Sequence, residues 1–306
     1  MFKIFNERNV LLNVLILISL TLFSGNSVAS ATPSDVYHKV SMINAEIKLI
    51  RNELGVSKEV REPVLQTNKT PAHVYIKSLE LFKKVSKLQK KHDIESNSLP
   101  EIPIQDITPE NVLTVTDHIY DEVIRIKKKL GINQSIKEVE FYAGRTPSNV
   151  YENIWQASYL IDGMIKAIGP TGVFENTLRV QNELKLIASH FNVDLSYISG
   201  ERQSGKTPKQ AHLLGYVNLH KLSLLEEKLK MKAFRVPTYP KAKISPSDVY
   251  DITNLMLAEI NRIKVHLGIK QTAKIESVSG RKRPSHVWVQ MNWINDQVVY
   301  LTGISQ

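Results

Sequence analysis

The sequence predicts an all-α protein that is built from a repeated helical unit. Ser-Pro or Thr-Pro, or a near variant, recurs at regular intervals, and similar residues surround each of these prolines. The segments between them carry apolar residues at spacings of three and four, which is the period of an amphipathic helix. A fixed period of this kind indicates duplication of a structural unit.

Eight prolines mark the expected starts of the helices. Successive members are 38 residues apart, except for one step of 23 residues in the middle of the chain. The second four repeat the first four with a shift of 137 residues, and two further prolines of each half obey the same shift. The chain is therefore predicted to contain two duplicated halves. The eight prolines are Pro33, Pro71, Pro109, Pro147, Pro170, Pro208, Pro246 and Pro284.

The residues around these prolines are typical of a helix N-terminus. Segment 32–37 reads Thr-Pro-Ser-Asp-Val-Tyr, segment 245–250 reads Ser-Pro-Ser-Asp-Val-Tyr, and segment 146–151 reads Thr-Pro-Ser-Asn-Val-Tyr. Ser or Thr at the N-cap accepts a hydrogen bond from an otherwise unpaired amide. Proline in the first helical position loses nothing, because the N–H group that it lacks would have no partner there.

The ends of four helices are equally clear. Gly or Asn follows the proline by 22 residues at Gly55, Gly131, Asn192 and Gly268, and these residue types accept the left-handed conformation that ends a helix. Each such helix should span about 21 residues, or roughly 32 Å. One example of the apolar stripe is Val36, Val40, Ile43, Ile47, Ile50 and Leu54. Steps of four and three predict helices that cross at about 20°, as in four-helix bundles.

These patterns predict eight long antiparallel helices, arranged as two tandem four-helix bundle-like halves over residues 32–168 and 169–306. Within each half the helices are joined by connections of about 15 residues, whereas Ile168-Gly169-Pro170 leaves no linker between the halves. A continuous superhelix of helical hairpins is the alternative.

Residues 1–31 are expected to be a signal peptide rather than part of the fold. Lys3 and Arg8 precede an apolar run, which is followed by small residues ending in Ala29-Ser30-Ala31. A retained membrane anchor is the alternative. With no transmembrane span after cleavage, the mature chain should be periplasmic or secreted. The chain has no cysteine, which excludes disulfides, thiolate metal sites and cysteine nucleophiles.

The positive net charge of the chain suggests an anionic partner. The chain has a formal net charge of +10 at pH 7, which favours acidic polymers, lipid headgroups or acidic proteins. Basic residues stand directly before predicted helix N-termini, where free amides and a cation together can bind an anion. These candidates are Lys69, Arg145, Lys206, Arg281, Lys282 and Arg283. The competing interpretation is that duplication has merely copied a solvated basic loop.

Other motifs have simpler structural explanations. Residues 200–207 fit the phosphate-binding pattern G-x-x-x-x-G-K-[ST], but Thr207 precedes Pro208 and is expected to be a helix N-cap. The aromatic residues of the first turns are expected to pack in the core. Basic runs such as 83–87 and 127–129 are expected on solvated outer faces.

The sequence favours a binding or interaction module over an enzyme, with an anionic ligand or an envelope protein as its partner. No metal site, cofactor or specific nucleic-acid contact is expected: the histidines form no ligand pattern, and aromatics are not interleaved with the basic runs. A structural envelope or matrix protein that acts by multivalent self-association is one alternative. An enzyme with a site between the halves is another, and convergent carboxylates with perturbed pKa values would favour it.

Overall fold

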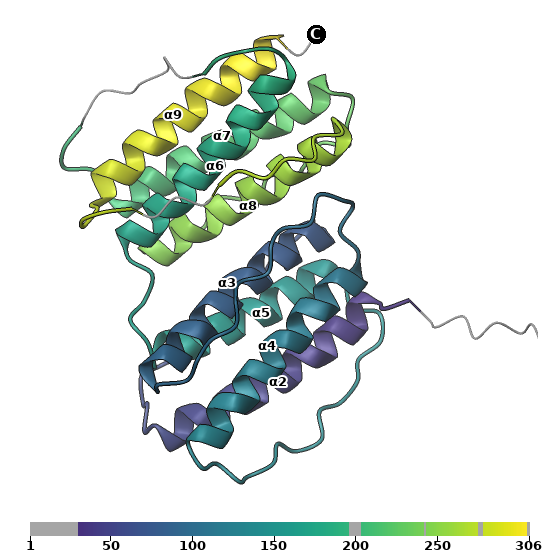
Figure 1. Ribbon diagram of the computed structural model, residues 1–306, viewed down its shortest axis with the longest axis vertical. Helices are drawn as coiled ribbons and strands as arrows, with labels where there is room; N and C mark the ends of the chain where they lie inside the picture. Colours follow the sequence, from purple (N-terminus) through teal and green to yellow (C-terminus); the bar gives the residue numbers. More distant parts are fainter. Residues whose placement is uncertain (1–29, 196–202, 242, 275–277, 305–306) are drawn as a thin grey trace, which may run out of the picture. The chain divides into compact units, whose positions relative to one another are not determined.

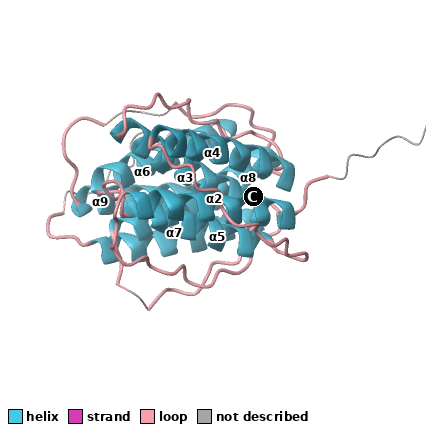
Figure 2. Ribbon diagram, turned by 90° about the horizontal axis from the view of Figure 1, so that it is seen from below, coloured by secondary structure: helices cyan, strands magenta, loops and turns pink. Residues whose placement is uncertain are grey.

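A computed structural model describes residues 30–195, 203–241, 243–274 and 278–304. Within these ranges every regular element is an α-helix, and the connections run along the outside of the helices (Figures 1 and 2). The helices are α2 (Pro33–Glu53), α3 (Pro71–Lys91), α4 (Pro109–Lys129), α5 (Pro147–Asp162), α6 (Pro170–His190), α7 (Pro208–Lys228), α8 (Pro246–His266) and α9 (Pro284–Ile304). The all-α fold with two bundle-like halves is confirmed.

The helix ends follow the sequence signals closely. Six of the helices begin with a capping box, in which the N-cap Ser or Thr and the third helical residue bond reciprocally: α2, α3, α4, α5, α7 and α8. Thr207 caps α7 as expected, and only residues 203–207 of the phosphate-loop motif lie within the described residues. Gly55, Gly131, Asn192 and Gly268 all have positive φ, between 57° and 71°.

Each half is a bundle of four parallel helices, so the expected antiparallel arrangement is wrong. In the first bundle the first turns of all four helices enclose one small apolar hollow, lined by Pro33, Val36, Pro71, Val74, Pro109, Val112, Pro147 and Val150. The second bundle has the same ring, formed by Pro170, Val173, Pro208, Ala211, Pro246, Val249, Pro284 and Val287. All four N-termini of a bundle therefore lie at one end.

The lengths of the connections explain this topology. Segments such as 54–70 and 130–146 hold about 17 residues, which reach roughly 56 Å when extended. A helix of 21 residues is only about 32 Å long, so an extended connection can return along the whole bundle and start the next helix at the original end. Only 163–169 is too short to return, and α6 consequently starts near the C-terminal end of the first bundle.

Within each bundle, the first and second helices lie diagonally opposite each other, and each packs against the third and fourth helices. In the first bundle, α2 and α3 each pack against both α4 and α5; in the second bundle, α6 and α7 each pack against both α8 and α9. The predicted apolar stripes form the core: Val36, Val40, Ile43, Ile47 and Ile50 of α2 are at most 1% exposed. These stripes are buried because each faces two neighbouring helices.

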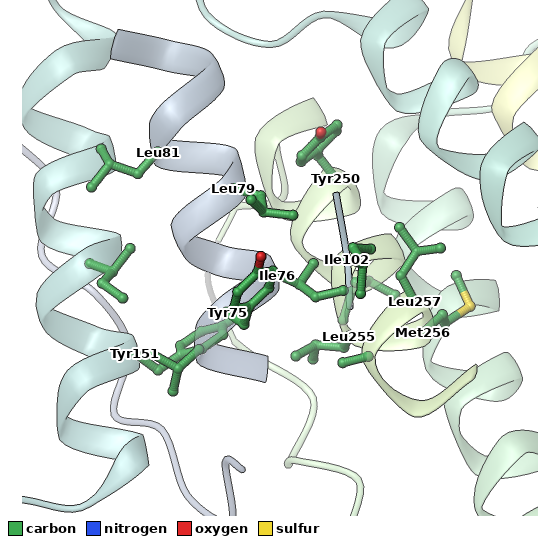
Figure 3. Close-up of a cluster of buried hydrophobic side chains, with 14 of the residues drawn as sticks. Tyr75, Ile76, Leu79, Leu81, Ile102, Tyr151, Tyr250, Leu255, Met256 and Leu257 are labelled. Atoms are coloured by element: carbon green, nitrogen blue, oxygen red, sulfur yellow. The ribbon is translucent and has the colours of Figure 1, made fainter. Parts of the chain in front are cut away.

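The two bundles pack through α3 and α8, and residues 32–306 form one compact unit. His73 near the start of α3 meets Glu259 late in α8, whereas Lys83 late in α3 meets Tyr250 early in α8. The two helices are therefore antiparallel. Figure 3 shows the apolar part of this interface, where Ile76 of α3 lies toward Leu255 of α8 with Ile102 close by.

A buried ionic network accompanies these apolar contacts. The ammonium group of Lys77 lies 2.9 Å from Glu80 and 2.8 Å from Asp251 of the other bundle. Burial alone would lower the pKa of Lys77, but the two carboxylates raise it above its ordinary value. Asp251 also accepts a hydrogen bond of 2.6 Å from the hydroxyl of Tyr151, and Asn254 donates to Glu80 across the interface. The network satisfies charges that burial would otherwise make costly.

Removing the central cation should be strongly destabilising. In the variant Lys77→Met, Glu80 and Asp251 stay buried without their cation, and we expect the free energy of unfolding to fall by about 3–5 kcal/mol. Urea denaturation followed by circular dichroism measures this loss. The triple variant Lys77→Met, Glu80→Gln, Asp251→Asn should recover most of it, and a Lys77→Met protein as stable as the parent would contradict this account.

Disulfide trapping should report the parallel orientation. The chain contains no cysteine, and the amide of Arg145, just before α5, donates to the Ser34 hydroxyl of α2 at 3.0 Å. We expect Ser34→Cys with Arg145→Cys to form a disulfide, visible as a mobility shift on a non-reducing gel. The control pair Ser34→Cys with Asp162→Cys should stay reduced, because Asp162 lies about 22 Å further along the helix axis. The reverse pattern would indicate antiparallel helices.

Candidate anion-binding groove

Four of the predicted basic residues take part in one repeated structural contact. Their backbone amides donate to a Ser or Thr hydroxyl in the first turn of a neighbouring helix, at distances of 3.0 to 3.1 Å. The pairs are Lys69 with Ser148, Arg145 with Ser34, Lys206 with Ser285, and Lys282 with Thr171. In each pair, the Ser or Thr that follows the helix-initiating proline accepts a hydrogen bond from the backbone amide of the basic residue before another helix of the same bundle.

The side chains of the same four residues lie over aromatic rings. The ring belongs to the residue three positions after the hydroxyl acceptor, and cation-to-centroid distances range from 4.2 to 5.1 Å. The rings are Tyr151 for Lys69, Tyr37 for Arg145, Trp288 for Lys206 and Phe174 for Lys282. A cation in this position contributes about 0.5–2 kcal/mol. These contacts give the basic positions a role in holding each bundle together.

The predicted residues do not form a single site. Lys69 is 5% exposed, and burial lowers its pKa to about 8, so it is part of the interior. Lys69 and Arg145 belong to the first bundle. The backbone amide of Lys206 is bonded to Ser285 at the start of α9, in the second bundle. Arg283 directly precedes α9 and is exposed. Only Arg281 and Lys282 join a larger group of cations.

That group lines a cavity of about 720 Å³ where the two bundles join. Five of the described residues that line it are basic, and no described lining residue is acidic. They come from the C-terminal part of α3, from the 163–169 connection and from the segment before α9: Lys87, Lys91, Lys166, Arg281 and Lys282. A concentration of like charge without a balancing carboxylate creates a strongly positive local potential.

The N-terminus of α6 opens into the same cavity. Its N-cap is Gly169, which has no side chain to accept a hydrogen bond, in contrast to the six helices with capping boxes. Pro170, Thr171 and Gly172 of the first turn all line the cavity. The uncapped amides and the positive end of the helix dipole therefore add to the charge of the five side chains.

A second cavity, of about 670 Å³, continues the first one. The two share Lys87 and Gly172, and the second is also lined by Lys83, Lys84, Lys90 and Arg179. Unlike the first, it contains two carboxylates, Glu80 and Glu175. We call the two cavities together the junction groove.

Two cations of the groove are poorly solvated. Burial lowers the pKa of Lys83 to about 8, and the positive charge of Arg179 adds to this effect. Burial also lowers the pKa of Arg179, although Glu183 attracts its charge. Within the described part of the chain, Nε of Arg179 is buried without a hydrogen-bond acceptor. An anion in the groove would relieve both penalties, because nearby negative charge favours the protonated forms.

The sequence interpretation missed the lysines of α3. Run 83–87 was expected on a solvated face, yet Lys84 is only 1% exposed and pairs with Asp162 at 2.7 Å. Lys127 is also buried and pairs with Glu46 at 2.7 Å. A run of lysines is expected to be exposed when the partner helix is unknown, and the carboxylates that pair with Lys84 and Lys127 lie on other helices of the same bundle, far away in sequence.

A separate titratable cluster lies inside the interface of α3 and α8. Nε2 of His73 lies 2.6 Å from Glu259, and Arg262 is 3.0 Å from Glu226. Burial and the neighbouring Glu259 together raise the pKa of Glu226 to about 9. These carboxylates do converge with perturbed pKa values, as the enzyme alternative requires. However, His73, Glu226 and Glu259 are all 1% exposed or less, which keeps them from meeting a dissolved substrate.

The other half of the chain carries a neutral version of this carboxylate pair. Gln89 is the repeat equivalent of Glu226, and its amide donates to Glu122, the repeat equivalent of Glu259. The amide can therefore take the place of a protonated carboxyl group in this packing. The second bundle instead depends on keeping a proton on Glu226.

The variant Glu226→Gln should change the pH dependence of stability. Because the folded pKa of Glu226 exceeds its unfolded value, the parent protein should lose stability as pH rises from about 4.5 toward 9. One proton contributes at most about 1.4 kcal/mol per pH unit. We expect Glu226→Gln to flatten this slope and to be more stable than the parent at pH 8, in urea denaturation at pH 5, 6.5 and 8. Parallel pH profiles for the two proteins would refute the role of this proton.

Across the described residues, no helix is long and apolar enough to cross a membrane. The same residues contain no group of three or more His, Asp or Glu side chains placed to hold a metal ion. Comparison with known proteins found no matching family model, no matching curated protein and no matching solved structure.

Proposed function

We propose that this protein is an exported binding module that takes up an anionic ligand in the junction groove. The observation that carries the proposal is the set of five basic side chains around one cavity. No described residue of its lining is acidic, and an uncapped helix N-terminus opens into it. Such a site attracts phosphate, sulfate or carboxylate groups both by charge and by free amides.

The size and shape of the groove favour a ligand with several negative groups. Its two cavities, of about 720 and 670 Å³, share Lys87 and Gly172 and together present basic residues from α3, α6 and the segment before α9. A single phosphate would contact only a fraction of these cations. An extended or multiply charged anion would bridge both cavities and gain from each additional contact.

The proposal includes export of the chain. The basic start, the apolar run and the small residues before Thr32 support a signal peptide in residues 1–31. In that setting the ligand would be an acidic envelope or extracellular component rather than a cytoplasmic nucleotide. A binding module of this kind needs only the charged groove and a rigid pair of bundles to hold it.

Binding to a defined polyanion tests the proposal. Isothermal titration calorimetry of the purified protein with inorganic tripolyphosphate should give saturable binding that weakens as salt is added. The triple variant Lys87→Gln, Arg281→Gln, Lys282→Gln should bind at least about tenfold more weakly, because each exposed charge contributes about 0.5 kcal/mol or more.

The matched control is Lys48→Gln, Lys128→Gln, Lys129→Gln. It removes the same number of charges from exposed helical positions that do not line the groove. We expect this control to keep the affinity of the parent protein. An equal loss in both triple variants would show that binding follows net charge alone, and would remove the groove from the proposal.

A further inference from the structure

The outer face of α7 carries an apolar stripe that no described part of the chain covers. Leu213 is 54% exposed, Val217 is 38% exposed and Leu224 is 46% exposed. Their spacing of four and then seven residues places them on one side of the helix. Val299 of the adjacent α9 is also exposed. Several exposed apolar side chains on one face are typical of an interaction surface.

The internal repeat shows that this face is an interface in the other bundle. The shift of 137 residues relates α7 to α3, whose outer face packs on α8. Ile76, the equivalent of Leu213, is 3% exposed and lies in that interface (Figure 3). Glu80, the equivalent of Val217, is bonded to Asn254 of α8. The same helix face is therefore covered in one copy of the repeat and open in the other.

The outer face of α3 is partly charged, whereas the equivalent face of α7 is apolar, and this difference indicates what kind of surface can cover α7. On α3, Lys77 and Glu80 meet the polar side chains Asp251 and Asn254 of α8. On α7 the equivalents of Lys77 and Glu80 are Leu214 and Val217. The α7 face can make no comparable ionic network, so the surface that covers it must be apolar.

The repeat also excludes a simple head-to-tail stack of chains. In such a stack α4 would cover α7, because α4 is the repeat equivalent of α8. The described exposed residues of α4 are polar or charged and include Thr114, His118, Asp121 and Arg125. Burying these groups against leucine and valine would leave them without partners, at a cost of several kcal/mol. The α7 face of a second copy, with its exposed Leu213, Val217 and Leu224, supplies an apolar surface of the same helical spacing.

We propose that two copies of the chain form a twofold symmetric dimer in which α7 packs antiparallel on α7 of the partner subunit. With the axis between residues 218 and 219, Leu213 lies opposite Leu224 of the partner subunit. Val217 then lies near the axis, opposite His220 of the partner subunit. Such a self-complementary contact uses one patch twice and closes the assembly at two chains.

The dimer is independent of the anion site. The junction groove is lined by residues of α3, α6, the connecting segments and the first turn of α8, and no residue of α7 contributes to it. A change at Val217 therefore tests the dimer without touching the five cations, and the groove variants test ligand binding without touching α7. Each proposal can fail while the other stands.

Sedimentation velocity on the purified protein at about 100 μM should show a dimer. The variants Val217→Glu and Val217→Lys should each be monomeric, with dimer affinity reduced at least about a hundredfold by like charges close to the axis. Because the two charges attract, an equal mixture of the two variants should restore a dimer that contains one copy of each. Circular dichroism should show the parent helix content in both variants.

The matched control is Thr114→Glu on the exposed face of α4, which should remain dimeric. A parent protein that stays monomeric at this concentration would overturn the proposal, as would Val217→Glu and Val217→Lys variants that dimerise alone. Loss of the dimer in Thr114→Glu with retention in Val217→Glu would instead indicate head-to-tail contacts through α4, and would also overturn it.

Discussion

The arrangement of this protein depends on one constraint: each long connection must carry the chain back along a helix of about 32 Å. That return puts all four N-termini of a bundle at one end, where the first-turn prolines and valines meet in a ring. It also brings each helix start close to the next, so that the amide before one helix can bond the hydroxyl of another, as for Arg145 and Ser34. The basic and aromatic residues of the repeat then form pairs between neighbouring units.

Parallel helices align their dipoles, which is unfavourable unless the ends are compensated. Capping boxes satisfy the amides at the N-terminal end, with Asp35 as the acidic partner in α2. Cations gather at the C-terminal end, for example Lys90 and Lys91 of α3. The two bundles are joined through antiparallel α3 and α8, so the C-terminal end of one meets the N-terminal end of the other. The junction groove lies where these lysines approach the uncapped start of α6.

Most of the local structure can be predicted from the sequence, whereas the long-range arrangement of the helices cannot. The caps at Thr146 and Ser245 and the left-handed Gly55 and Gly131 are determined within a few residues, and the chain shows each as expected. Helix direction depends on where a long connection leads, which no residue pattern encodes directly. The burial of Lys84 depends on its pairing with Asp162 of α5, and the pairing of His73 with Glu259 depends on the contact between the bundles. The groove was foreseen only at Arg281 and Lys282, because its other cations come from segments far away in sequence.

The return connections also set how the chain must fold. In most helical bundles, short loops let consecutive helices pair as soon as they form. Here α2 packs against α4 and α5 rather than against α3, which follows it directly. The start of α5 lies more than a hundred residues along the chain from the start of α2. Closing such long loops before any contact is gained slows folding, and rates correlate with the sequence separation of contacting residues. This all-helical protein should thus reach its native state on the timescale of β-sheet proteins, with its apolar stripes only partly covered until the fourth helix of each bundle has packed.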